Sequence, residues 1–282
     1  MAVGSESAGS AAAPFHAIAC LAIVLGTLIG CHTPSIRATG LPTRHSIEAD
    51  QLLMLSNFKL ERDHPLVQDL IELRTRVTTE LELPANSQQV VVYLFETEDE
   101  YRSYLERTYP GLPPRRAYFV GTSHELAVYT YWGDRIREDL RHEYTHGLLH
   151  ACLMDVPLWL DEGIAEYYEV VGSDGHNHEY SAQLATSISN GWRPDLPRLE
   201  KLNSVAQMQR VDYLESWAWV HFLLHSSPDS RQLLIDYLAD LRQPPVTRQL
   251  NQRIQAEWPD LTTRLHNHIA GLASSLNWQP PG

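Results

Sequence analysis

The sequence predicts an α+β fold, with a small β-sheet and helices in its N-terminal part and helices alone in its C-terminal part. The segments that we expect to form strands are rich in β-branched and aromatic residues, and all of them lie before residue 133. From about residue 179 onward, apolar residues instead recur at the spacing of amphipathic helices. With 282 residues and 43% hydrophobic content, the chain can form a sizeable core.

The charge of the chain argues against one class of partner. The formal net charge is −13 at pH 7, and it is spread along the chain without a basic stripe. Binding of DNA or RNA depends on clustered Lys and Arg residues that contact phosphates. We therefore expect no nucleic-acid partner, and the negative charge mainly favours solubility.

The N-terminus contains a targeting segment. The apolar run 17–30 is too short to span a bilayer comfortably and is typical of a signal-peptide core. Leu28-Ile29-Gly30-Cys31 resembles a bacterial lipobox, which implies that residues 1–30 are removed and that acyl chains on Cys31 tie the protein to a membrane. The resemblance implies a lipoprotein of the cell envelope that faces outside the cytoplasm. An ordinary secretory signal or a plain anchor helix is the alternative.

The rest of the chain divides into a tether, one domain and a tail. Residues 31–48 are rich in Thr, Pro, Ser, Gly and Arg and show no periodic apolar face, so we expect a flexible tether. The folded domain is expected to span residues 49–275, with a tail at residues 276–282. If Cys31 is lipidated and Cys20 is removed, Cys152 is the only remaining cysteine and no intramolecular disulfide forms.

The N-terminal part of the domain is predicted to mix strands and helices. Pro65 suits a first helical position, and the apolar spacing after it predicts a helix that ends by Pro84. Thr97 and Glu100 form a capping-box pattern for a helix that ends before Pro110. The predicted strands lie within residues 50–60 and at residues 90–95, 117–121 and 125–132.

A His-Glu-x-x-His motif falls on a helix that we expect to begin at Asp134, as its N-cap, and to end near Leu153. Residues four apart lie one turn above each other on a helix, so His142 and His146 can direct two imidazoles at one ion. Glu143 stands beside them and is placed to take a proton from a water molecule. A catalytic zinc ion typically has three protein ligands and one water. The motif therefore predicts a zinc site.

Glu162 is the predicted third ligand. Pro157 ends the first helix, so the chain can turn back and bring Glu162 to the two histidines. Glu166 lies one turn further along the second helix. We expect its carboxylate to accept the free ring N–H of a ligating histidine, which would fix the tautomer of that ring.

These residues resemble the motifs of the gluzincins, the thermolysin-like and aminopeptidase N-like metallopeptidases, whose third ligand is a Glu on the helix after the His-Glu-x-x-His helix. Residues 158–167 are similar to the W-L-x-E-G-x-A-x-Y stretch of the peptidase MA-like group. The connection from His146 to Glu162 is somewhat shorter than in the best-known gluzincins. The resemblance covers about residues 140–170, and it implies a zincin-like (thermolysin-like) fold, Zn²⁺ as cofactor and a peptide or protein substrate.

The same resemblance implies two further parts of the site. In gluzincin-like domains the strand before the metal helix lies at the sheet edge, which would place the substrate along residues 126–130. Tyr213 resembles the tyrosine that stabilises the oxyanion in the MA-like group, and His221 is the second candidate. An ordinary hairpin and an apolar helix stripe are the alternative interpretations of these two segments.

Other histidines are expected to lie outside the site. The longer metzincin motif is excluded because it requires Gly and His where this chain has Leu149 and Cys152. His150 continues the four-residue spacing, but after two turns it has rotated away from the metal, so we expect a packing or surface residue. His176 and His178 lie in a predicted loop, where solvent exposure is expected in preference to metal binding.

The sequence thus favours a zinc metallopeptidase or amidohydrolase in which Glu143 is the general base and Tyr213 the oxyanion donor. The alternative is a non-catalytic protein of the same fold that binds a peptide or protein partner at the cell envelope. The Gly-x-Met-Glu-Asn signature of exopeptidases does not occur in the chain, which favours an endopeptidase or cleavage of a peptidoglycan-type amide.

Overall fold

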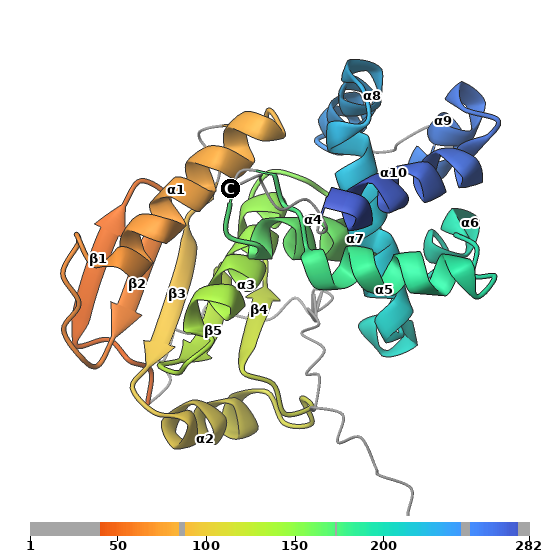
Figure 1. Cartoon of the computed structure of the whole chain (residues 1–282). Coiled ribbons are helices and arrows are strands. Elements are labelled where there is room, and N and C mark those ends of the chain that lie inside the picture. The colour runs from red at the N-terminus through yellow and green to blue at the C-terminus, as the bar shows by residue number, and fades with distance from the viewer. Residues whose placement is uncertain (1–39, 85–87, 173, 244–248, 276–282) are drawn as a thin grey trace, which may run out of the picture.

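The computed structural model describes residues 40–84, 88–172, 174–243 and 249–275. One sheet lies in the N-terminal part, and helices alone form the C-terminal part (Figure 1). Helices α3 (Ile136–His150) and α4 (Leu158–Glu169) lie between the sheet and the remaining C-terminal helices. The predicted α+β class is confirmed.

The sheet consists of β1 (His45–Ala49), β2 (Leu52–Ser56), β3 (Val90–Phe95), β4 (Ala117–Gly121) and β5 (Leu126–Tyr131). The strand order is β1-β2-β3-β5-β4. β3 runs parallel to β2 and to β5, whereas β1 with β2 and β4 with β5 are antiparallel pairs. The predictions for β3, β4 and β5 agree with the structure to within one residue at each end.

The place of β5 in the sheet corrects the predicted substrate strand. β5 pairs with β3 on one side and with β4 on the other, so the backbone of residues 126–130 has no open edge for a further strand. β4, the other strand of the pair, forms the edge of the sheet and also contacts α3. The edge beside the metal helix is therefore residues 117–121.

The sheet begins earlier in the chain than expected. β1 and β2 form a hairpin whose turn includes Asp50 at a φ of 51°. β2 lies within the predicted first strand, but β1 occupies residues 45–48 of the predicted tether. Because β1 is largely exposed and has no apolar alternation, its sequence lacks the usual signal of a strand.

The predicted signal peptide (1–30), the lipidation site Cys31 and the tail (276–282) lie outside the described residues. Within the part of the chain that the structure describes, no helix has the length and apolar content needed to cross a membrane. Cys152 is half-buried and not part of a disulfide.

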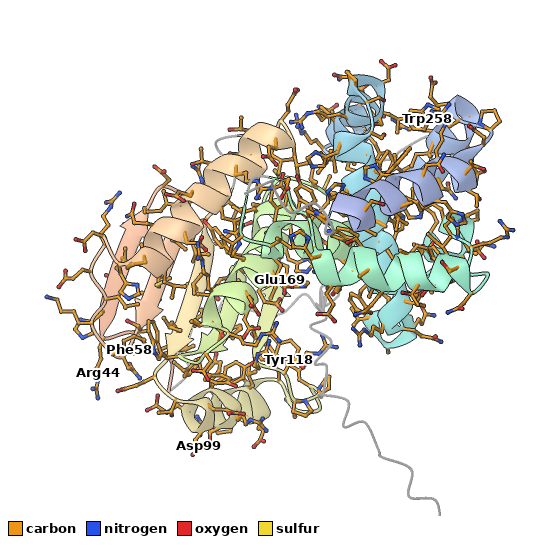
Figure 2. All side chains as sticks on the ribbon, in the orientation of Figure 1. Arg44, Phe58, Asp99, Tyr118, Glu169 and Trp258 are labelled. Atoms are coloured by element: carbon orange, nitrogen blue, oxygen red, sulfur yellow. The ribbon has the colours of Figure 1, made fainter. Side chains whose placement is uncertain are left out.

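Helices cover both faces of the sheet. α1 (Pro65–Glu80) and α3 pack on one face, and α2 (Glu98–Thr108) packs on the other, where Figure 2 labels Tyr118. β3 supplies its even-numbered residues to the first core and its odd-numbered residues to the second, which explains its continuous apolar sequence. The predicted cap of α2 is present, since the Thr97 hydroxyl accepts the Glu100 N–H at 3.3 Å.

Helix α3 begins one residue later than predicted. Its N-cap is Arg135, which makes no side-chain capping bond, so Asp134 is not the cap. The helix ends at His150, and Pro157 is the N-cap of α4. The short connection returns the chain, so α4 packs against α3.

The C-terminal helices pack around a buried central helix, α7 (Arg210–His225). α7 contacts α4 most extensively, and also α5, α8 and α10. The other helices of this part are α5 (His178–Ser189), α6 (Leu196–Leu199), the 3₁₀ helix η1 (Val205–Gln207), α8 (Pro228–Asp240), α9 (Leu250–Glu257) and α10 (Leu261–Ser275).

Candidate metal centre

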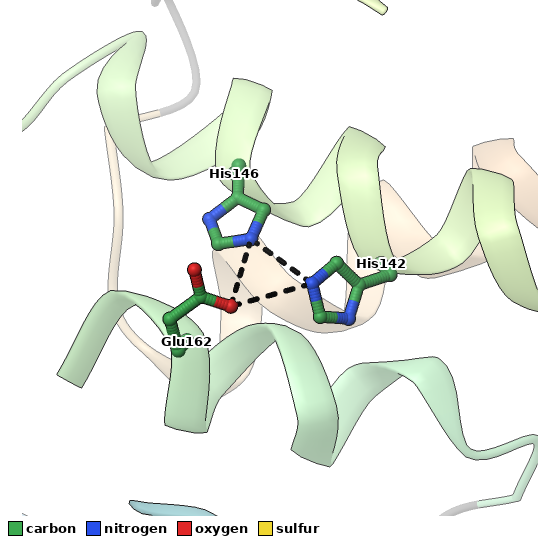
Figure 3. Close-up of side chains that lie close together, drawn as sticks. All are labelled: His142, His146 and Glu162. Carbon is green, nitrogen blue, oxygen red and sulfur yellow. Dashed lines mark hydrogen bonds and ion pairs between the residues drawn. The ribbon is translucent and has the colours of Figure 1, made fainter. Parts of the chain in front are cut away.

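The three predicted ligands meet in the structure (Figure 3). The Nε2 atoms of His142 and His146 are 3.2 Å apart. Glu162 Oε2 lies 3.6 Å from His142 Nε2 and 3.9 Å from His146 Nε2. A tetrahedral ion with bonds of about 2.1 Å holds its ligand atoms about 3.4 Å apart. The three atoms are therefore spaced as ligands of one small ion.

The site is buried and rich in carboxylates. His142, Glu143, His146 and Glu162 are all 0% exposed. Burial lowers the pKa of His142, but the carboxylates of Glu162 and Glu169 outweigh burial and raise that pKa well above its ordinary value. Buried negative charges are costly unless they are paired or bound to a cation. Charge as well as spacing therefore suits a divalent metal ion.

Two candidate ligands are each followed directly by a glycine: Gly147 follows His146, and Gly163 follows Glu162. These glycines let α3 approach β3 closely and let α4 approach α7 closely. A Cβ on Gly147 would lie 2.6 Å from Val90 Cγ1 in β3. A Cβ on Gly163 would lie 2.6 Å from the Ser216 carbonyl oxygen in α7. Any larger residue at these positions must displace tightly packed atoms. The two glycines thus help to set the depth at which α3 and α4 hold the ligands.

Carboxylates contact the ring nitrogens that face away from the three ligand atoms. His142 Nδ1 is 3.1 Å from Glu169 Oε2, and His146 Nδ1 is 3.0 Å from Asp161 Oδ1. At His142, the Glu169 carboxylate can accept the Nδ1–H, which would leave the Nε2 lone pair for a metal. The His146–Asp161 contact has the distance of an ion pair, but its two atoms form no hydrogen bond among the described residues. Asp161 directly precedes Glu162. Glu169 lies about two turns after Glu162, on the same side of α4.

The structure corrects the predicted role of Glu166. Its Oε2 accepts a hydrogen bond from the Tyr180 hydroxyl at 2.8 Å, and not from a histidine ring. Burial and the adjacent Glu169 carboxylate raise the pKa of Glu166 well above its usual range. Glu166 and Glu169 lie about one and two turns after Glu162 on α4, so helical spacing places both on the same side of the helix. Only the packing of α4 could decide which of the two contacts His142.

Asp161 joins a second histidine to the centre. Its Oδ2 lies 3.0 Å from His150 Nε2, while its Oδ1 faces His146. The Phe119 ring of β4 stacks on both imidazoles, with ring centres 6.2 Å and 5.4 Å away. His150 is half-buried and is connected to His146, a candidate metal ligand, through one carboxylate. Its contact with Asp161 was not expected from the sequence.

Glu143, the predicted general base, reaches the edge of the sheet. Its Oε2 accepts a 2.7 Å hydrogen bond from the backbone N–H of Phe119. Phe119 therefore contacts the candidate base through its backbone and the candidate ligand His146 through its ring. The metal centre and the edge strand β4 are thus adjacent.

Tyr213 lies near the start of α7. It is buried in a small apolar cluster with Val205, beside Leu158 and Met208. Leu158 is one turn before Glu162 on α4, so Tyr213 packs against the helix that carries the third ligand. Its role as oxyanion donor stays a prediction.

His221, the second candidate for that role, is engaged elsewhere. Its Nδ1 lies 2.9 Å from His268 Nε2. It does not belong to the groups of ligand atoms around His142 and His146 in the described residues.

Comparison with protein-family models and with curated proteins finds no match for this chain.

Proposed function

We propose that this protein is a zinc-dependent hydrolase of peptide or amide bonds, built on a zincin-like domain of the gluzincin type. The observation that carries the proposal is the convergence of His142, His146 and Glu162 at the spacing of ligands to one ion. Two imidazoles and one carboxylate are a common ligand set of catalytic zinc, and they leave the fourth position open.

The surrounding side chains have distinct roles in this proposal. When bound, zinc polarises the substrate carbonyl and acidifies water. Glu143 takes the proton from the attacking water and delivers it to the leaving nitrogen. Glu169 and Asp161 hold the two imidazoles with Nε2 toward the ion. Tyr213 donates a hydrogen bond to the oxyanion.

The substrate would bind along β4 instead of β5. Among the described strands, β4 has a neighbour on one side only, so its outer edge can accept an extended peptide. The Phe119 N–H that contacts Glu143 belongs to this strand. A peptide that pairs with β4 would therefore lie beside the proposed base.

We also propose that the enzyme works at the cell envelope. The lipobox-like sequence before Cys31 supports removal of residues 1–30 and lipid attachment at Cys31. Mass spectrometry of the membrane fraction, with Cys31→Ala as control, would detect the acylated N-terminal peptide. Wild-type protein that is soluble and unmodified would contradict this part of the proposal.

The test of the function combines metal content with hydrolysis of a quenched peptide library. Glu162→Ala should lose about one zinc ion per chain relative to the wild type and lose hydrolysis with it. Glu106→Ala is the matched control, because Glu106 is exposed on α2. Unchanged zinc and activity in Glu162→Ala would exclude this site. Zinc loss in the variant without any turnover by the wild type would favour the non-catalytic alternative.

A further inference from the structure

Arg141, which directly precedes the candidate ligand His142 on α3, is a buried arginine that binds the end of α4. It is only 4% exposed. Its Nε donates to the Glu169 carbonyl oxygen and its Nη2 to the Val170 carbonyl oxygen, each at 3.1 Å. Glu169, labelled in Figure 2, is the last residue of α4, and Val170 is its C-cap. Carbonyls at the end of a helix lack partners within the helix, so Arg141 satisfies groups that need a donor.

A carboxylate of a third helix holds the same guanidinium. Arg141 Nη1 donates to Asp69 Oδ1 at 3.1 Å, and Asp69 is a buried residue of α1. A buried charge is costly unless it is paired, and here one carboxylate and two carbonyls surround the guanidinium. A planar guanidinium donates in several fixed directions at once, which an ammonium group does not. α1 therefore helps to set where the Arg141 side chain meets the end of α4.

The residue whose carbonyl Arg141 binds also contacts a candidate metal ligand. Glu169 Oε2 lies 3.1 Å from His142 Nδ1, and His142 is the next residue after Arg141. Helix ends fray readily, so the position of a side chain on the last turn depends on what holds its backbone. Arg141 holds the backbone of Glu169, and the side chain of Glu169 contacts His142. The two contacts together join the end of α4 to one turn of α3.

We propose that Arg141 is a positioning residue of the metal centre, which fixes the last turn of α4 and so holds the Glu169 carboxylate against His142 Nδ1. Arg141 is not a ligand, because a protonated guanidinium has no lone pair to offer a metal. It acts through Glu169, and partners that orient a ligand histidine typically change metal affinity by about 10–100-fold. The proposal deepens the proposed function and rests on it in one respect, that the bound ion is zinc.

The test is a double-variant cycle on zinc affinity with Arg141→Lys and Glu169→Gln. Lysine keeps the positive charge beside Asp69 but not the planar fork that reaches two carbonyls. In the wild-type background, Arg141→Lys should weaken zinc binding by about 10-fold. In the Glu169→Gln background the same change should weaken it by less than about twofold, because the carboxylate through which Arg141 acts is already absent. No loss in the wild-type background, or an equal loss in both, would overturn the proposal.

Arg137→Gln is the matched control. Arg137 lies one turn before Arg141 on α3 and donates to the same Asp69 Oδ1 at 2.5 Å. Its side chain is 52% exposed, and within the described residues it makes no hydrogen bond to α4. Zinc affinity of Arg137→Gln should therefore stay within about twofold of the wild type. A loss as large as that in Arg141→Lys would assign the effect to the charges around Asp69 and would contradict the proposal.

Proton exchange at the His142 ring in metal-free protein separates this proposal from the proposed function. A hydrogen bond to Glu169 slows exchange of the His142 Nδ1–H with water, and NMR of the ring protons detects it. Exchange should be about 10-fold faster in Arg141→Lys than in the wild type or in Arg137→Gln. Equal rates in Arg141→Lys and the wild type would refute the positioning role. Slow exchange in a wild type that binds no zinc would support it and sink the hydrolase alone.

A further measurement uses the wild type alone, so it does not depend on whether Arg141→Lys folds. Coupling between two contacts is reciprocal, so zinc bound by His142 should strengthen the contact of Arg141 with α4. Saturation with zinc should slow exchange of the Arg141 Nε–H by about 10-fold and leave that of Arg137 unchanged. Exchange at Arg141 that is the same with and without bound zinc would overturn the proposal.

Discussion

Asp161 Oδ1 lies 3.0 Å from His146 Nδ1, while the Nε2 atom of the same ring faces Glu162 Oε2. Glu169 has the same relationship to His142, at 3.1 Å. In each candidate ligand histidine, the Nδ1 atom thus contacts a carboxylate of α4, the helix that also carries Glu162. At His142 the hydrogen bond to Glu169 favours the tautomer that would present Nε2 to a metal.

Glu169→Gln should weaken zinc binding about 10–100-fold, because the amide keeps the shape of the side chain but loses the charge that orients His142. Glu166→Gln should have a much smaller effect, since Glu166 bonds Tyr180 and not a ligand ring. Competition with a chromophoric chelator measures both affinities. A larger loss in Glu166→Gln than in Glu169→Gln would contradict these assignments.

Glu143→Gln should keep zinc and lower kcat by about 10²–10⁴-fold, because the amide cannot take a proton from water. The amide oxygen can still accept the Phe119 N–H, so the local structure should survive. Zinc content and circular dichroism are the controls, and peptide hydrolysis is the readout. Full activity of the variant would remove Glu143 from the mechanism.

Gly147→Ala should destabilise the protein by about 1–3 kcal/mol, because the new Cβ overlaps Val90 Cγ1. Gly271→Ala is the matched control: it lies within α10, and a Cβ at this position would meet no atom within 4 Å, so alanine should stabilise the helix by up to about 1 kcal/mol. Denaturant unfolding measures both changes. Adding Val90→Ala should recover part of the loss in Gly147→Ala, and an additive double variant would argue against the clash.

Glu215 should make stability depend on pH. Burial raises its pKa from 4.5 to about 7, and its Oε1 accepts the Asp195 N–H at 2.6 Å. Because the folded pKa exceeds the unfolded one, its contribution is complete below pH 4.5 and is lost as the pH rises through 7. The loss is on the order of 3 kcal/mol.

Glu215→Gln removes this ionisation and should gain stability relative to the wild type as the pH rises from 4.5 to about 7. Above that pH the gain should level off. Urea unfolding across the range measures it, and Glu106→Gln, at an exposed position of α2, controls for the loss of a carboxylate. A difference between Glu215→Gln and the wild type that does not change with pH would contradict the assignment.

Local patterns in the sequence were sufficient to predict most elements and the group of three residues that could hold a metal ion. The four-residue spacing of His142 and His146 places both rings on one side of a helix wherever that helix packs. The strands at residues 90–95 and 117–121 were predictable because their β-branched and aromatic content is itself a local signal. β1 was not, since pairing with β2 and not its own composition holds it in the sheet.

Relations between elements were decided only by the tertiary structure. Packing of α4 on α3 and α7 brings Asp161 and Glu169 into contact with the ring nitrogens and gives Glu166 the Tyr180 hydroxyl as its hydrogen-bond partner. The order of the sheet makes β4 its edge, and the contact of α10 with α7 brings His268 to His221. The sequence by itself determined which residue types recur on each face of a helix or strand. Periodicity shows that a face is buried but not what covers it, because the partners are supplied by distant parts of the chain.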